Sequence, residues 1–216
     1  ETTDSLAALQ KLAQTYRQSF SIPVIGITGS NGKTLVKEML ASILCLDRRT
    51  YRSPLSYNTQ IGAALGLLGM RREHEIAIIE AGISLPGEME RLERMIRPDH
   101  GILTVISKAH IGGFGTLGET LEQKRQLFKN LGPSSFLALN ADDEISMNLV
   151  SETEANVITF GFSHNADVRA IEWHEYPEQG SRFVMKLFAE ELEIDLSAPG
   201  RFNILNALAA SAMAKK

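Results

Sequence analysis

The segment 26–34, GITGSNGKT, is the part of the chain best suited to bind phosphate, and it is named the phosphate loop here. Glycines let backbone N–H groups curl around phosphate oxygens, because they adopt conformations that other residues rarely reach. Lys33 can reach the outer phosphates of a nucleotide, and the Thr34 hydroxyl can bind Mg²⁺. The segment therefore predicts nucleotide phosphate chemistry. The alternative is a glycine-rich turn carrying Gly-Lys-Thr by chance, since Ile27 stands where the strict motif has glycine.

Two further polar positions could complete such a site. Glu80 ends an apolar run, and an acid at the end of a neighbouring strand helps to hold Mg²⁺ in phosphate-loop proteins. Asn58 lies in the polar stretch 56–62, SYNTQIG, just before an apolar helix, where amides and hydroxyls suit a phosphate or a carboxylate. The alternatives are a solvated carboxylate at Glu80 and a simple helix cap at Asn58 or Thr59.

Four other residues are ambiguous on their chemistry alone. His110 lies among glycines in a loop after a strand, where it could bind metal or phosphate but is more typical of an exposed loop histidine. Lys124 is typical of a solvated lysine on a helix face. Asn203 and Asn206 share one helix face and could contact a base edge, although capping by Asn203 is the simpler interpretation.

The elements that must position these residues alternate between short apolar runs and longer amphipathic segments. This alternation predicts an α/β fold, with a mostly parallel sheet and helices on both faces. After residue 166 the pattern changes, and it predicts a small antiparallel β appendage near residues 167–197. The predicted helices are 4–20, 33–46, 61–70, 86–95, 117–131 and 203–216, and the predicted strands are 24–28, 75–80, 101–106, 136–140, 156–160, 168–173, 182–188 and 191–196.

Length and composition limit the class of protein. The 216 residues predict one large domain, and a hydrophobic fraction of 44% with 22% charged residues is typical of a globular chain. A net charge of −4 argues against a general nucleic-acid binder, and the single cysteine argues against a disulfide framework. No run is long and apolar enough to predict a membrane span, and no signal-peptide pattern is present, which favours a cytoplasmic location.

Read in order, these motifs resemble the ATP-binding central domain of the Mur ligase family, a P-loop NTPase-like α/β domain. The resemblance runs from about residue 4 to the end of the chain. It implies that residues 1–216 form one such domain, with an N-terminal UDP-binding domain and a C-terminal domain absent from this chain. The motifs that carry it are 28–34 TGSNGKT, 57–62 YNTQIG, 79–82 IEAG, 109–115 AHIGGFG, Lys124, 140–143 NADD and 200–207 GRFNILNA.

Three stretches look most like the branch of the family that joins D-Ala-D-Ala to UDP-MurNAc-tripeptide. They are 58–62, 80–88 and 110–115. The branch implies an ATP-dependent ligase of peptidoglycan precursor synthesis, and thus a part in cell-wall biogenesis, cell shape and cell division. ATP would phosphorylate the peptide carboxylate, and the amine of D-Ala-D-Ala would attack the acyl phosphate. The isolated 216-residue chain is expected not to ligate.

The resemblance also implies roles for individual residues. ATP would be bound by the phosphate loop and two asparagines, one Mg²⁺ by Thr34 and Glu80, and a second by His110. Lys124 would be carbamylated and act as an oxygen ligand. The residues implied for catalysis are Lys33, Glu80, His110, Lys124 and Asn58; those for ATP are Gly29, Ser30, Asn31, Gly32, Lys33, Thr34, Asn203 and Asn206; those near the acceptor substrate are Ser56, Asn58 and Gln60.

Three positions depart from the family pattern. Leu35 follows Gly-Lys-Thr where threonine is common, Gly112 stands where glutamate often follows the histidine, and Phe202 replaces the histidine common before the first asparagine. The alternatives left open are another Mur ligase, a folylpolyglutamate synthase-like ligase and a non-catalytic nucleotide-binding module. A GTPase switch would need an Asn-Lys-x-Asp motif, which the sequence lacks.

Overall fold

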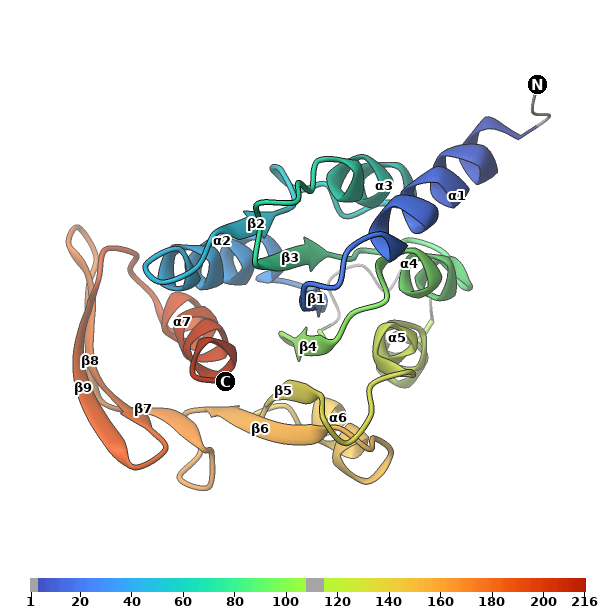
Figure 1. Ribbon diagram of the computed structural model, residues 1–216. Coiled ribbons are helices and arrows are strands. Elements are labelled where there is room, and N and C mark those ends of the chain that lie inside the picture. Colours follow the sequence, from blue (N-terminus) through green and yellow to red (C-terminus); the bar gives the residue numbers. More distant parts are fainter. Residues whose placement is uncertain (1–3, 108–114) are drawn as a thin grey trace.

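A nine-stranded sheet organises the chain in the computed structural model, which describes residues 4–107 and 115–216 (Figure 1). Its strand order is β2-β3-β1-β4-β5-β6-β7-β8-β9. The strands β2 to β7 run parallel, and β8 and β9 are antiparallel to their neighbours. The bounds are β1 Val24–Thr28, β2 Thr50–Arg52, β3 Ile76–Glu80, β4 His100–Leu103, β5 Phe136–Asn140, β6 Asn156–Gly161, β7 Val168–Tyr176, β8 Gly180–Leu187 and β9 Glu190–Leu196.

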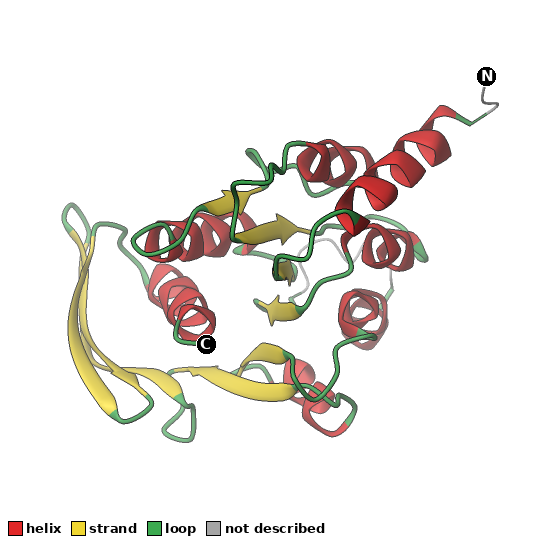
Figure 2. Cartoon of the chain, in the orientation of Figure 1, coloured by secondary structure: helices red, strands yellow, loops and turns green. Residues whose placement is uncertain are grey.

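Helices cover both faces of the sheet, as the sequence predicts (Figures 1 and 2). One buried apolar cluster lies between the sheet and α1, α3, α4 and α5, and a second lies between the sheet and α2 and α7. The helices are α1 Ser5–Gln18, α2 Lys33–Leu44, α3 Gln60–Leu68, α4 Glu88–Ile96, α5 Leu117–Arg125, α6 Glu144–Met147 and α7 Arg201–Ala214, with short 3₁₀ segments η2 Gln126–Phe128 and η3 Asn148–Ser151.

The central strands are apolar along their whole length because helices cover both of their sides. In β1 (VIGIT) and in β3 (IAIIE) every residue is buried. β1 pairs in parallel with both β3 and β4, so the carboxyl ends of the three strands meet at one edge of the sheet. Open parallel sheets bind ligands at this edge, and the phosphate loop leaves β1 there.

The predicted appendage is confirmed as antiparallel strands, but it is continuous with the main sheet. β7 pairs in parallel with β6 through Phe160 and Gly161, and β8 and β9 extend the same sheet by antiparallel pairing. The predicted strand 101–106 is too long, because β4 ends at Leu103. The chain then leaves the ladder, and the Val105 carbonyl accepts a hydrogen bond from Ser30 of the phosphate loop. β2, α6 and the two 3₁₀ segments were not predicted.

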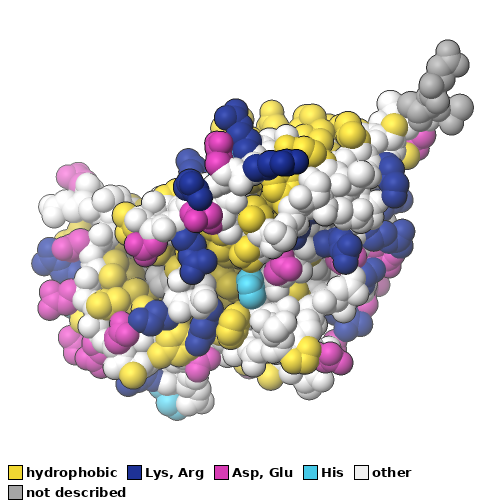
Figure 3. All heavy atoms as spheres, viewed as in Figure 1, with side chains coloured by type: hydrophobic (Ala, Val, Ile, Leu, Met, Phe, Trp, Pro, Cys, Tyr) yellow, Lys and Arg dark blue, Asp and Glu magenta, His cyan; other side chains and the backbone are white. Residues whose placement is uncertain are grey.

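The surface carries both signs of charge. On the face shown in Figure 3, basic and acidic side chains are interspersed, in keeping with a small net charge of −4. Within residues 4–107 and 115–216, no helix has the length and apolarity that crossing a membrane requires.

Candidate active site

The phosphate loop ends at the start of α2 and leaves the end of that helix open. Gly32 is the N-cap residue with φ of 83°, and no side chain of the described residues caps the helix. The first N–H groups of α2 and its dipole therefore face the loop, as an anion site requires. Lys33 Nζ donates to the carbonyls of Gly29 and Ser30, at 3.1 and 3.3 Å. Burial lowers the pKa of Lys33, while the charge of Glu80 acts in the opposite direction.

The segment after β4 holds the loop in shape. Thr104 Oγ1 donates to the Asn31 carbonyl at 2.5 Å, and the Ser30 amide donates to the Val105 carbonyl at 2.8 Å. Ser107 adds further contacts: its Oγ accepts from Asn31 Nδ2, and its amide and carbonyl both bond to Ser30 Oγ. Hydrogen bonds from the segment after β4 therefore fix the conformation of the phosphate loop.

Thr104 lies so close to the phosphate loop that only glycine fits at position 29, and a substitution there tests this. The φ of Gly29 is 147°, and an added Cβ would lie 2.0 Å from Thr104 Oγ1. Gly29→Ala is therefore expected to lower the free energy of unfolding by about 3 kcal/mol, measured by urea denaturation. Gly87→Ala is the control, because Gly87 also has positive φ (78°) but no atom of the described residues lies within 4 Å of an added Cβ. Its expected loss is about 1 kcal/mol, and equal losses would contradict the steric argument.

Glu80 is fully buried at the end of β3, and polar groups converge on its carboxylate. Thr34 Oγ1 donates to Oε2 at 2.8 Å, and Asn58 Nδ2 donates to Oε1 at 2.7 Å. Ser56 Oγ lies 3.2 Å from Thr34 Oγ1. The structure therefore brings together four residues that the sequence singled out in three separate segments. Helix capping at α3 is left to Thr59, whose side chain accepts from the Gly62 amide.

Lys124 is buried, so its interpretation as a solvated lysine on a helix face is wrong. Its Nζ donates to the Gly29 carbonyl at 3.1 Å, and Lys33 donates to the same oxygen. Burial lowers the pKa of Lys124 to about 8, and the charge of Lys33 adds to the effect. The spacing of apolar residues in α5 could not predict the burial of Lys124. The phosphate loop covers this side of the helix, and that packing is a long-range contact.

The asparagine pair lies beside the same loop. Asn206 is 3% exposed, and an added Cβ on Gly32 would lie 2.4 Å from its Oδ1. Its Nδ2 is buried and has no hydrogen-bond partner in the part of the chain that the structure describes. Asn203 does not cap α7, since Gly200 is the N-cap, and its Nδ2 donates to the Pro199 carbonyl. His110 lies outside the described residues.

A cavity of about 180 Å³ opens between these elements. Its rim includes Gln60, whose amide bonds to Gln10 and to Glu88. Glu88 in turn accepts from the Ser84 and Leu85 amides, and these bonds lower its pKa although burial acts in the opposite direction. The cavity is lined by Gly29, Ser30, Lys33, Asn58, Thr59, Gln60, Gly82, Ile83, Ser84, Glu88, Thr120 and Lys124.

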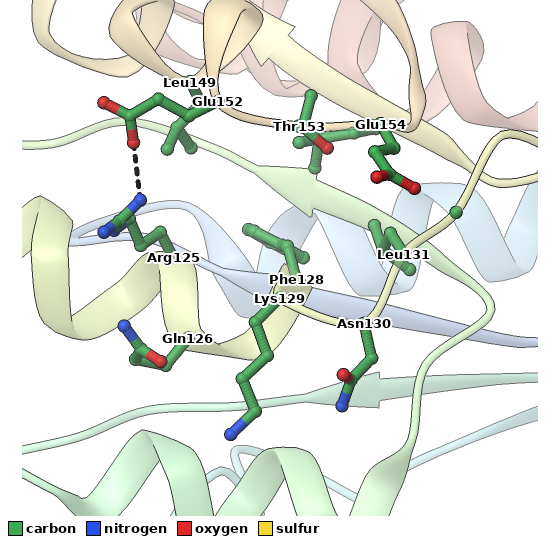
Figure 4. Close-up of a pocket in the computed structure, with 12 residues that line it drawn as sticks. Arg125, Gln126, Phe128, Lys129, Asn130, Leu131, Leu149, Glu152, Thr153 and Glu154 are labelled. Atoms are coloured by element: carbon green, nitrogen blue, oxygen red, sulfur yellow. Dashed lines mark hydrogen bonds and ion pairs between the residues drawn. The ribbon is translucent and has the colours of Figure 1, made fainter.

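A larger cavity, about 480 Å³, lies elsewhere (Figure 4). It is formed by the end of α5, by η2 and by residues 149–154, near the amino end of β5. Arg125 and Glu152 close one side of it through an ion pair. It contains none of the residues that the sequence singled out, and it lies away from the carboxyl edge of the sheet.

Residues that sequence reasoning missed also belong to the site. Thr104 and Ser107 shape the phosphate loop from the segment after β4. Lys37 is fully buried beside Glu80, with Nζ 3.8 Å from Oε2. Its signal was available in the sequence, because it lies one helical turn after the phosphate loop among the apolar residues of α2.

A phosphate-binding loop at the carboxyl edge of a parallel sheet, with a buried acid on the adjacent strand, defines the class of P-loop NTPase-like α/β domains. Residues 27–214 match the family described as the Mur ligase middle domain. The chain therefore belongs to the Mur ligase family.

Relatives with curated names show the same similarity. The chain is 32% identical over 209 residues to the UDP-N-acetylmuramoyl-tripeptide–D-alanyl-D-alanine ligase of Bacillus subtilis, and 33% identical over 213 residues to that of Escherichia coli. Each alignment covers 97% of this chain but 44% and 47% of the relatives. The chain thus spans about half the length of the curated relatives it matches.

Solved structures give the same result for the fold. A crystal structure of MurF from Acinetobacter baumannii superposes with a TM-score of 0.92 at 28% identity, over 99% of this chain and 47% of that one. MurF from Thermotoga maritima in complex with ADP superposes with a TM-score of 0.88 at 28% identity, over 99% and 50%. The predicted α/β fold is confirmed.

Proposed function

We propose that this chain is the central, nucleotide-binding domain of an ATP-dependent ligase that joins D-Ala-D-Ala to UDP-MurNAc-tripeptide. The observation that carries the proposal is the convergence of Thr34, Asn58 and Glu80 beside the phosphate loop. The names of the relatives support the choice of substrates. The MurF structure with ADP supports the choice of nucleotide. On this proposal the reaction takes place in the cytoplasm.

Lys33 and the N-terminus of α2 would bind the phosphates of the nucleotide. Lys33 would exchange the loop carbonyls for the β- and γ-phosphates, with the open N-terminus of α2 adding its partial positive charge. Such fixed positive groups stabilise the charge on a phosphoryl group during transfer to the peptide carboxylate. The amine of D-Ala-D-Ala then forms the amide bond as phosphate leaves. Asn58, Ser56 and Gln60 line the side from which the acceptor would approach.

The residues present fit a magnesium ion. Mg²⁺ in nucleotide sites is held by one or two carboxylates, a hydroxyl and the substrate phosphates. Glu80 Oε2 and Thr34 Oγ1 are hard oxygen donors only 2.8 Å apart at the mouth of the loop. We propose that they hold one Mg²⁺, with His110 and carbamylated Lys124 serving a second. Bound Mg²⁺ would supply positive charge to the transferring phosphoryl group.

The base of the nucleotide would lie near α7. Asn206 Nδ2 is a buried donor with no partner among residues 4–107 and 115–216, and a buried polar group of this kind calls for a partner such as water or a ligand. We propose that Asn206 and Asn203 contact adenine. Phe202, with its exposed ring against Gly32, provides an apolar surface beside them.

Substrate choice is the test of this proposal. A full-length ligase carrying this chain, with flanking UDP-binding and C-terminal domains, is expected to release phosphate from ATP only with UDP-MurNAc-tripeptide and D-Ala-D-Ala together. The 216-residue chain alone is expected to bind Mg·ADP but not to ligate. Phosphate release driven by a folate substrate would favour a folylpolyglutamate synthase-like enzyme instead. Turnover by the isolated chain would overturn the domain assignment.

A further inference from the structure

A buried lysine outside the phosphate loop joins three parts of the proposed site. Lys37 lies in α2 with its side chain fully buried, and it is one of the largest fully buried side chains. An ammonium group without water is costly unless charges and hydrogen bonds surround it. Its partners therefore indicate what the position requires.

Those partners belong to the 53–58 loop and to the end of β3. Lys37 Nζ donates to the Ser53 carbonyl at 2.8 Å and to the Leu55 carbonyl. It also lies 3.8 Å from Glu80 Oε2 and 3.3 Å from Glu38 Oε1. One ammonium thus connects the phosphate-loop helix, the loop that carries Ser56 and Asn58, and the buried acid.

The backbone of the 53–58 loop needs such a contact. Leu55 has φ of 45°, a left-handed conformation that is strained for leucine. Its side chain is 76% exposed, so packing of that side chain does not compensate the strain. The hydrogen bond from Lys37 Nζ to the Leu55 carbonyl compensates this strain. The loop then returns to the site, where Ser56 lies beside Thr34 and Asn58 donates to Glu80.

We propose that Lys37 is a positioning residue, which holds the 53–58 loop and Glu80 in register with the phosphate loop so that Ser56, Asn58 and Glu80 face Thr34. The inference rests on the proposed Mg·nucleotide site. Lys37 does not contact the nucleotide in this arrangement, because its ammonium is enclosed by protein oxygens. Lys33 and the loop amides remain in place without it.

The test compares Lys37→Met with Arg17→Met in the 216-residue chain. Arg17 is a matched control: it is also a buried cation, 7% exposed, that donates to backbone carbonyls and pairs with a carboxylate, Asp99. Asp99 accepts from the Val24 amide, which places this contact at the opposite edge of the sheet from the phosphate loop. Urea denaturation measures the stability lost in each variant.

Two readouts decide the outcome. In Lys37→Met, amide hydrogen exchange over residues 53–58 should quicken at least about 10-fold relative to Arg17→Met, after correction for global stability. ADP affinity without Mg²⁺ should stay within about 2-fold, while the apparent Mg²⁺ affinity of the ADP complex should fall about 10- to 100-fold. Lys37→Gln retains a donor, so it should show both effects at smaller size, and it carries the test if the methionine variant does not fold.

Two results would contradict the positioning role of Lys37, and a third would contradict the proposed function. Unchanged exchange in the 53–58 loop would overturn the positioning role. Tighter Mg²⁺ binding in Lys37→Met would also overturn it, because simple repulsion between the ammonium and Mg²⁺ would then be the main effect. Failure of the unaltered chain to bind Mg·ADP would instead overturn the proposed function, and the exchange measurement would still decide whether Lys37 holds the loop.

Discussion

Lys33→Ala is expected to abolish most activity of the proposed ligase, with kcat/KM reduced about 10²- to 10³-fold. The physical reason is that Lys33 Nζ donates to the Gly29 and Ser30 carbonyls at the loop mouth, where nucleotide phosphates would compete for it. Affinity of the 216-residue chain for Mg·ADP should fall about 10- to 100-fold, the value of a charge-assisted contact. Calorimetric titration with Mg·ADP measures this loss directly.

The free energy of unfolding of Lys33→Ala shows whether its loss of Mg·ADP affinity arises from misfolding. Burial lowers the pKa of Lys33, so its charge is unfavourable in the fold, and the alanine variant should be no less stable than the original chain. Lys11→Ala is the control, because Lys11 is an exposed lysine of α1 that contacts only Gln14 in the described structure. If Lys33→Ala retained both Mg·ADP affinity and ligation, the assignment of the phosphate loop would be wrong.

Lys124→Ala is expected to lower ligase activity by a similar factor, about 10²-fold or more, and short carboxylic acids should restore part of it. The reason is that a carbamate at Lys124 would supply oxygen ligands where the unmodified ammonium would repel a metal. Acetate or propionate can place a carboxylate in the space left by the alanine. Lys129→Ala is the control, since Lys129 is a partly exposed lysine just after η2. Full activity with no carbamate mass at Lys124 would contradict the hypothesis.

The pKa of Lys124 sets the pH dependence of this modification. Carbamate forms from the neutral amine, and a pKa of about 8 leaves about a tenth of the amine neutral at pH 7 and about half at pH 8. At a fixed concentration of dissolved CO2, the rate of carbamate formation should therefore rise about fivefold from pH 7 to pH 8 and level off above pH 9. An ordinary lysine would instead become tenfold more reactive with each unit up to about pH 10.

Much of the fold is readable from the sequence because the parallel strands are buried on both faces. Runs such as 24–28 and 76–80 are apolar throughout, and the amphipathic segments between them are long enough to be helices. The continuity of β7 with β6 could not be read this way. Pairing between Phe160 and Val168 depends on where the chain turns, and hydrophobic patterning does not record the partner of a strand.

The candidate site was only partly readable. The phosphate loop and Glu80 have local signals, and the structure brings Thr34 and Asn58 onto Glu80. Lys124 lacks such a signal, and the place of Lys37 among the apolar residues of α2 predicts its burial but not its partners. A buried lysine is recognised fully only by the carbonyls around it. Those carbonyls come from Gly29, 95 residues away from Lys124, and from the loop after β2. Long-range contacts of this kind follow from the tertiary structure alone.

The nine-stranded sheet has two open edges, and each is unsuited to pairing with another molecule. β2 is only three residues long, so it offers few unpaired backbone groups. β9 is longer, but Glu190, Glu191, Glu193 and Asp195 are exposed along it. A second copy of β9 laid against that edge would bring its acidic side chains close to these. The negative charge of β9 therefore disfavours edge-to-edge aggregation of two copies of the chain through this strand.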